Sequence, residues 1–86
     1  MPAFKMEDLL NKPVFDNTGV HVGEIILTQQ DKKTKLVRTA QLQIDPNLKI
    51  KHPDITRSVI SLDLNIVYVE PTTKKVSLVK TVMEIA

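Results

Sequence analysis

The sequence predicts an all-β domain: a small six-stranded antiparallel β-barrel with at most one short helical turn. Val, Ile and Thr, which favour strands, make up 26 of the 86 residues. Short segments of alternating apolar and polar residues follow one another, and clusters of turn-forming residues separate them at regular intervals, as in small barrels and sandwiches. The predicted strands are residues 12–15, 20–30, 35–44, 58–61, 65–70 and 75–79.

Length and composition exclude several classes of protein. Residues 1–86 fit a single domain, with residues 1–8 as an N-terminal lead and residues 80–86 as an apolar tail. A domain of this size has a small core and therefore marginal stability. Because the sequence contains no cysteine, no disulfide or thiolate-bound metal can add to that stability. No segment approaches the roughly 20 apolar residues of a membrane-spanning helix, and no secretory signal is present, so we expect a cytoplasmic protein without membrane insertion. The net charge of +2 comes mostly from lysines, which disfavours nucleic acid as the partner.

Local signals define the first elements. Residues 6–11 form the one predicted helical turn, with two carboxylates at its start, where the helix dipole favours them. Pro13 cannot donate a hydrogen bond to a neighbouring strand, so it marks the entry or edge of the first strand. The following turn begins with Asp16, which can cap its own backbone, and ends with Gly19, which accepts a positive φ.

The second strand changes phase along its length. Val20 and Val22 share one face, whereas Ile25 and Leu27 occupy the other. We therefore predict a β-bulge near Gly23 that brings both pairs to the same side. A phosphate-binding role for the two glycines is disfavoured, because no helix follows them whose N-terminus could hold an anion.

The third strand has the alternation of a half-buried antiparallel strand. One face carries only apolar residues apart from Arg38, and the other face carries Thr and Gln. The apolar positions are Leu36, Ala40, Leu42 and Ile44.

Residues 45–54 are predicted to form the longest loop. This segment contains Pro46 and Pro53, but also Leu48 and Ile50, which are unusual in a loop exposed to solvent. Two interpretations remain open for these residues and for the apolar tail. They either fold over the ends of the barrel and close its core, or form a surface for a second copy or another protein.

The fifth strand is apolar on both faces. Ile66 and Tyr68 point one way and Val67 and Val69 the other, but a barrel has only one interior. We predict that Val67 and Val69 face outward and are covered by a second copy of the chain, since a homodimer would support so small a core. The predicted interface comprises Val67, Val69, Leu48, Ile50, Ile55, Val82, Met83 and Ile85.

No catalytic or metal site is predicted. His21 and Glu24 form one pair of potential ligands, and His52 and Asp54 another, but neither pair has an evident third ligand. No serine lies in the pattern of a nucleophile elbow. We therefore predict no enzymatic activity and no cofactor. Lysines gather at predicted turns, where they normally solvate the chain, and no aromatic residues lie among them to stack on bases.

Residues 9–25 resemble the opening of the PRC-barrel family. The matching positions are Lys12, Val14, Asp16, Gly19, Val22, Gly23 and Ile25. The resemblance implies a small closed β-barrel that mediates contacts and is not itself catalytic. That family includes a cytoplasmic domain of the photosynthetic reaction-centre H subunit, the C-terminal domain of a ribosome-maturation factor, and stand-alone archaeal proteins, some implicated in cell division. The sequence departs from the family pattern at Leu27 and Thr28, where an acidic residue is common, and in residues 45–56.

The sequence thus predicts a non-catalytic protein–protein interaction module. It would act as a homodimeric adaptor in an intracellular assembly, with archaeal cell division as the first process to test. The alternative is a ribosome-maturation or RNA-associated factor that uses the lysine-rich turns. The partners distinguish the two: itself and a protein of the division machinery in the first case, and rRNA or a ribosomal protein in the second.

Overall fold

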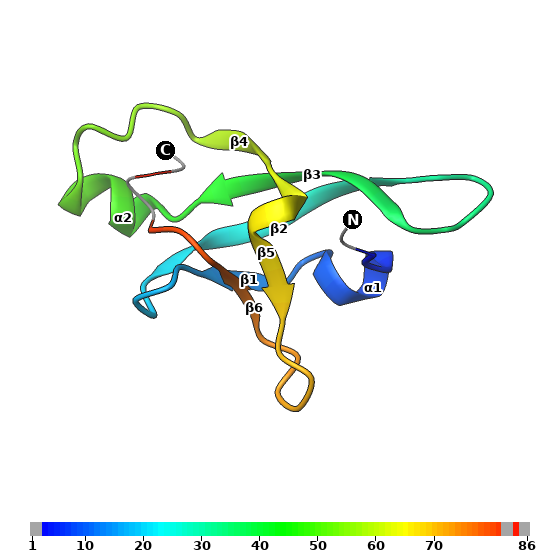
Figure 1. The fold of residues 1–86 in the computed structure, drawn as a ribbon. Helices are drawn as coiled ribbons and strands as arrows, with labels where there is room; N and C mark the ends of the chain where they lie inside the picture. Colours follow the sequence, from blue (N-terminus) through cyan, green and yellow to red (C-terminus); the bar gives the residue numbers. More distant parts are fainter. Residues whose placement is uncertain (1–2, 82–83, 85–86) are drawn as a thin grey trace.

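The computed structural model describes residues 3–81 and 84, and its main feature is a six-stranded mixed β-sheet curled into a half-barrel (Figure 1). The strand order across the sheet is β4-β3-β2-β1-β6-β5. Two short helices and a 3-10 turn, η1, accompany the sheet, so the fold is mostly β. The elements are α1 (Met6–Leu9), β1 (Pro13–Phe15), β2 (His21–Gln30), β3 (Val37–Ile44), α2 (Pro46–Lys51), β4 (Val59–Leu62), η1 (Leu64–Ile66), β5 (Val67–Val69) and β6 (Val76–Leu78).

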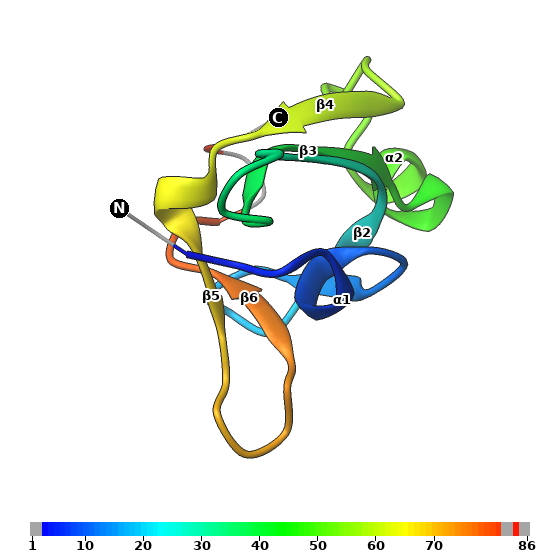
Figure 2. The same cartoon turned by 90° about the vertical axis from the view of Figure 1, so that its right-hand side faces the viewer.

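The sheet curls because a short connection joins its two edges. β4 and β5 lie at opposite edges, but only Asp63 and η1 link them along the chain. The edges of a flat six-stranded sheet would lie about 24 Å apart. The chain from Leu62 to Val67 reaches at most about 18 Å even when fully extended. The sheet must therefore bend until its edges approach each other at this end (Figure 2).

Two features of the predicted barrel are corrected. The sheet is a half-barrel, since β4 and β5 remain its edges, and it is mixed, since β1 and β6 run parallel with Val14 beside Val76. The parallel pair follows from the η1 connection. It carries the chain from one edge of the sheet to the other, and the antiparallel β5–β6 hairpin then places β6 next to β1.

Register shifts decide which residues of β2 face the core. The first shift lies between His21 and Gly23, which confirms the bulge predicted near Gly23 and leaves Val22 and Ile25 both fully buried. A second shift, at Ile26, turns the next position outward, so Leu27 is exposed instead of buried. The predicted bulge therefore accounts for only one residue of each apolar pair, because Val20 is exposed as well.

A third shift explains the exception in the pattern of β3. Gln29 lies opposite Thr39, but Gln30 lies opposite Val37, so Arg38 is an extra residue in the ladder. Arg38 consequently stays exposed, while Val37 takes the inward position before Ala40. An arginine can occur in an otherwise inward-facing series because the bulge removes it from that series.

The two glycines have the structural roles of a turn and a close contact. Gly19 has a φ of +88°, and the turn before it is held by Asp16, whose carboxylate accepts hydrogen bonds from the Thr18 amide at 2.8 Å and the Val20 amide at 3.0 Å. Gly23 faces the backbone of β3, and a Cβ at this position would overlap the Gln43 carbonyl oxygen. Gly23 is needed for this close approach of two strands.

The predicted loop at residues 45–54 contains a helix, α2. Asp45 caps it by accepting a hydrogen bond from the Asn47 amide at 2.9 Å, and Pro46 occupies the first turn, where its missing N–H costs nothing. Leu48 and, beyond the helix, Ile55 are buried in the core, which supports core closure for these two residues. Ile50 points to solvent and is 77% exposed.

The predicted orientation of the fifth strand is wrong. Val67 is buried in the core cluster with 6% exposure, and Val69 packs against that cluster. Tyr68 is the outward residue and is 45% exposed. Its neighbour before the strand, Ile66, is buried within η1, so the 3-10 turn breaks the alternation assumed for residues 65–70. The tail residues assigned to the interface, Val82, Met83 and Ile85, lie outside the described residues.

The predicted short helical turn is present as α1, where the Lys5 amide donates to the Asp8 carboxylate at 3.1 Å. Its Leu9 is fully buried against the sheet. No helix in the described part of the chain is long and apolar enough to cross a membrane.

Candidate functional site

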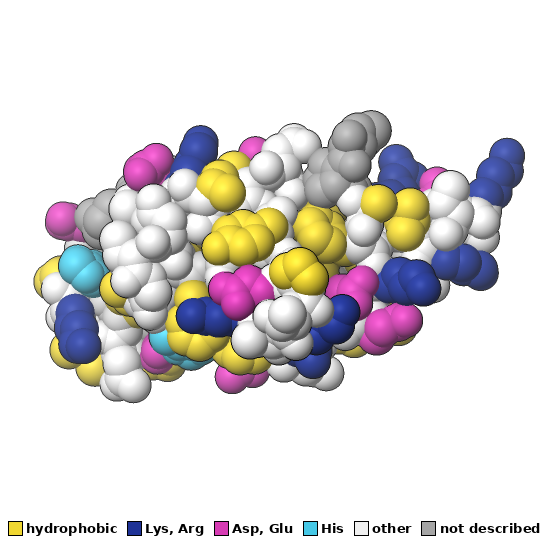
Figure 3. Space-filling view, turned by 60° about the horizontal axis from the view of Figure 1, so that its bottom comes forward, with side chains coloured by type: hydrophobic (Ala, Val, Ile, Leu, Met, Phe, Trp, Pro, Cys, Tyr) yellow, Lys and Arg dark blue, Asp and Glu magenta, His cyan; other side chains and the backbone are white. Residues whose placement is uncertain are grey.

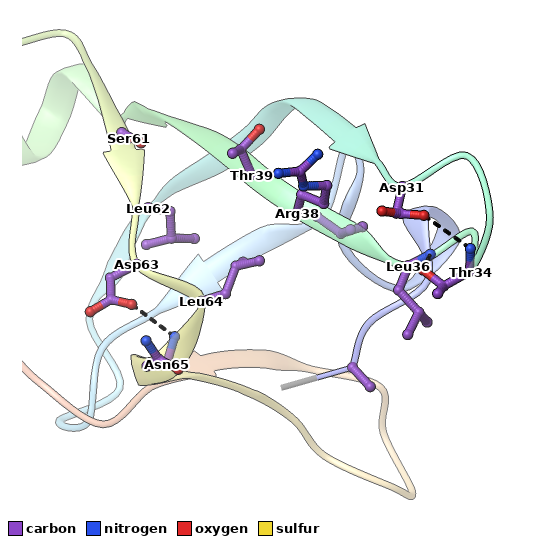
Figure 4. Close-up of a pocket in the computed structure, with 12 residues that line it drawn as sticks. Asp31, Thr34, Leu36, Arg38, Thr39, Ser61, Leu62, Asp63, Leu64 and Asn65 are labelled. Carbon is purple, nitrogen blue, oxygen red and sulfur yellow. Dashed lines mark hydrogen bonds between the residues drawn. The ribbon is translucent and has the colours of Figure 1, made fainter. Parts of the chain in front are cut away.

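A hollow of about 780 Å³ lies where β4 ends and η1 begins (Figure 4). We call it the edge groove. It is lined by the end of β4 and by η1 on one side, by the start of β3 on another, and by the chain before α1. Its residues are Ala3, Asp31, Thr34, Leu36, Val37, Arg38, Thr39, Ser61, Leu62, Asp63, Leu64 and Asn65.

The groove coincides with a break in the pairing along one edge of β3. On the side away from β2, β3 pairs with β4 only as far as Ala40, which lies opposite Leu62. Further towards its start, the same strand meets the chain before α1, where the Val37 amide donates to the Phe4 carbonyl at 2.8 Å and Leu36 forms a bridge with Lys5.

Between these two contacts lie the bulged residue Arg38 and Thr39, whose cross-strand partner is Gln29 of β2. Neither residue pairs with another strand on this edge within residues 3–81. The groove therefore exposes a short piece of sheet edge, a structure that can pair with another extended chain.

The floor of the groove is apolar and its rim is polar. In Figure 4, Leu62 and Leu64 point from β4 and η1 towards the space below β3, and Leu62 belongs to the buried core. At the rim, the Asp63 carboxylate accepts a hydrogen bond from the Asn65 amide at 2.9 Å. An apolar floor with a few polar groups at its margin is typical of ligand-binding clefts.

Three charged residues line the groove, and besides Asp63 these are Asp31 and Arg38, whose surroundings differ. Asp31 is engaged by its own turn, because its carboxylate accepts bonds from the Lys33 amide at 2.8 Å and the Thr34 amide at 3.2 Å. These bonds, aided by the more distant charge of Arg38, lower the pKa of Asp31. The Arg38 guanidinium is exposed and forms no ion pair with any described residue. It is the group in the groove best placed to bind an acceptor from outside.

A second, smaller cavity of about 350 Å³ lies beside α2 and contains His21, Asp45 and His52. The Nδ1 atom of His21 lies 2.8 Å from an Asp45 carboxylate oxygen. The His21 hydrogen bond, followed by the hydrogen bond from the Asn47 amide, lowers the pKa of Asp45. Because the other Asp45 oxygen caps α2, the pair joins β2 to the start of the helix.

A carboxylate that orients a histidine also occurs in catalytic triads, but such an arrangement needs a nucleophile. The residues lining this cavity include no hydroxyl or thiol side chain. In the part of the chain that the structure describes, no three or more His, Asp and Glu side chains are grouped to hold a metal ion. The pair formed by His21 and Asp45 thus connects two elements of the fold.

The structure therefore separates the residues that the sequence assigned to one interface. Val67, Leu48 and Ile55 are in the core, Val69 packs on it, and Ile50 is exposed at α2, away from the groove. The edge groove was not predicted from the sequence, although Arg38 is the polar exception in its strand. Comparison with known proteins matched the chain to no family model and to no curated protein.

Proposed function

We propose that this protein is a non-catalytic interaction module of PRC-barrel type, which binds a short extended segment of another intracellular protein in the edge groove. The observation that carries the proposal is the unpaired edge of β3 at Arg38 and Thr39, which lies directly above an apolar floor. An extended segment can satisfy such an edge with main-chain hydrogen bonds and place alternate side chains in the cleft.

The chemistry of the groove defines the segment. An apolar side chain would pack on Leu62 and Leu64, and a carboxylate would pair with the free guanidinium of Arg38. The unpaired stretch between the contacts of β4 and of Phe4 is short, so only a few residues of the partner can join the sheet. We therefore expect a short motif with an acidic residue near an apolar one, bound with modest affinity.

The resemblance of residues 9–25 to the PRC-barrel family supports a role in assembly, with a homodimeric adaptor in cell division as the first process to test. The alternative is an RNA-associated factor. Its support is the pI of about 9.0 together with three lysines, Lys32, Lys33 and Lys35, at the exposed tip of the β2–β3 hairpin.

A library of random short peptides displayed on phage tests the proposed function. Panning against the wild-type protein should enrich peptides that carry an acidic residue next to an apolar one. Arg38→Glu should abolish their binding, because the guanidinium is replaced by a repelling charge. Arg57→Glu is the matched control, since Arg57 is exposed but does not line the groove. The proposal fails if no motif is enriched, or if the enriched peptides bind Arg38→Glu as well as wild type.

A further inference from the structure

The register of four strands aligns the aromatic residues of the sheet in one row. Phe15 in β1 lies opposite His21 in β2 and beside Ser77 in β6, and Ser77 lies opposite Tyr68 in β5. The neighbouring inward residues, such as Val76, belong to the core, so the row lies on the outer, convex face. We call these four residues the convex row.

The convex row combines two aromatic rings, Phe15 and Tyr68, with two polar residues, and Tyr68 is its most exposed apolar member. Ser77 is only 5% exposed, although it faces outward, whereas Tyr68 is 45% exposed. Val79, just beyond β6, is 56% exposed and extends the apolar area. Figure 3 shows the side of the molecule that carries β1, β6 and the β5–β6 hairpin, where hydrophobic side chains gather in the middle with charges of both signs around them.

Two residues of opposite charge, Lys75 and Glu70, lie beside the convex row. The Lys75 ammonium lies 4.4 Å from the centre of the Phe15 ring, in the range of a cation–π contact. Directly opposite Lys75, on the other arm of the hairpin, is Glu70, whose amide donates to the Lys75 carbonyl at 3.0 Å. The Glu70 carboxylate accepts a hydrogen bond from the Thr73 hydroxyl at 2.7 Å.

Lys75 and Glu70 form no ion pair with each other, and the one ion pair found in the described residues joins His21 to Asp45. Each of these two charged groups contacts a neighbour within its own chain, but neither has an oppositely charged partner among residues 3–81 and 84.

We infer that the convex row is the surface through which two copies of this chain associate about a two-fold axis. Such an interface requires a self-complementary patch. Here the Lys75 ammonium of one copy can pair with the Glu70 carboxylate of the other copy. The two-fold symmetry then forms the same pair a second time with the roles of the two copies exchanged. Beside these pairs, the Tyr68 ring of each copy can pack against the partner, as aromatic anchors do in many interfaces. A standard interface buries about 800 Å² per partner, roughly a seventh of the 5724 Å² surface of this chain.

This inference rests on the proposed function and deepens it, because it relocates the homodimer contact of the fifth strand from Val67, which is buried, to Tyr68, which is exposed. The edge groove lies on other elements, at the start of β3, the end of β4 and η1. A dimer formed by the convex row would therefore present two grooves for partner segments.

Sedimentation-velocity measurements over a range of protein concentrations test the inference. Wild type should show a monomer–dimer equilibrium, and Tyr68→Thr, which keeps a strand-forming residue, should raise the dimer dissociation constant at least about tenfold. Ile50→Ser is the control, since Ile50 is more exposed than Tyr68 but lies outside the row, and it should leave the dimer unchanged. Circular dichroism shows whether each variant is folded.

Charge exchange provides an independent arm of the same test. Glu70→Lys and Lys75→Glu should each weaken the dimer, because like charges then meet across the axis, and the double variant should restore it. A monomeric wild type, or a double variant no better than the single ones, would overturn the inference. The inference would also be overturned if the protein were monomeric and bound a single-stranded oligonucleotide through Tyr68. Peptide binding by the folded Tyr68→Thr variant separates the two proposals, since the groove remains intact in it.

Discussion

The two glycines of the first hairpin should differ sharply when each is replaced by alanine. Gly23 is buried and pairs with Val14 on one side and Ile44 on the other. A Cβ on Gly23 would overlap the carbonyl oxygen of Gln43, and would lie 2.9 Å from its carbonyl carbon and 3.1 Å from the Ile44 Cα. All three atoms belong to the backbone of β3. Since β3 is paired on both sides, it cannot move away without loosening its ladders.

The magnitudes follow from these contacts. Extra methyl groups in a packed core typically cost about 1–3 kcal/mol, and here the obstacle is backbone, so Gly23→Ala should cost at least about 3 kcal/mol. At Gly19 nothing lies within 4 Å of an added Cβ, and only the φ of +88° opposes a side chain. A left-handed conformation costs about 1–2 kcal/mol for an alanine. Gly23→Ala should thus be the more damaging variant.

Urea denaturation followed by circular dichroism measures both free energies of unfolding, and thermal unfolding followed by the same signal measures the Tm values. For a domain of this size each kcal/mol lowers the Tm by about 4–8 °C. We expect a loss of more than about 12 °C for Gly23→Ala and a smaller loss for Gly19→Ala. Gly19→Asn is a further control, since asparagine tolerates positive φ and should recover part of the loss. A Gly23→Ala protein as stable as Gly19→Ala would refute the close approach of β2 and β3.

Three further predictions concern the core and the cap of α2. Leu48→Ala should lower the free energy of unfolding by about 2–5 kcal/mol, whereas Ile50→Ala should change it by less than about 0.5 kcal/mol. Denaturant titrations measure both values, and equal losses would contradict the placement of α2. Val67→Glu should leave the chain unfolded in circular dichroism, because it buries an unpaired charge, and a folded variant would contradict its burial. Asp45→Ala should cost about 1 kcal/mol at neutral pH through the lost cap. The hydrogen bonds of Asp45 hold its pKa below the ordinary 3.8. The difference in free energy of unfolding between wild type and Asp45→Ala is therefore fully present above pH 3.8 and shrinks as the pH falls through the folded-state pKa. A free-energy difference that does not change with pH would refute the role of the carboxylate.

Local sequence signals predicted most of the strands but not how they join. Alternation located β3, and Asp16 with Gly19 located the first turn, because both depend only on neighbours in the chain. The parallel contact of β1 with β6 depends on η1 carrying the chain between the sheet edges, which no local pattern reveals. The helix α2 was missed although its signal was present, since an Asp followed by Pro is a common helix start.

The candidate surfaces were harder to predict because they depend on register. Arg38 stood out as a polar residue in an apolar series, but only the bulge at this position and the end of the β4 ladder turn it into part of a groove. Phe15 and Tyr68 lie far apart in the sequence and meet in one row only through β6. Val67 was assigned to the surface because a regular alternation was assumed through residues 65–70, where the 3-10 turn interrupts it.

The most direct test of a binding edge groove is nuclear magnetic resonance of the ¹⁵N-labelled protein, titrated with a peptide selected by panning. We expect the amide resonances of residues 36–39 and 61–65 to shift as the peptide binds, since these residues line the edge groove. Shifts confined to the convex row or to α2, with the amides of the edge groove unchanged, would contradict this expectation.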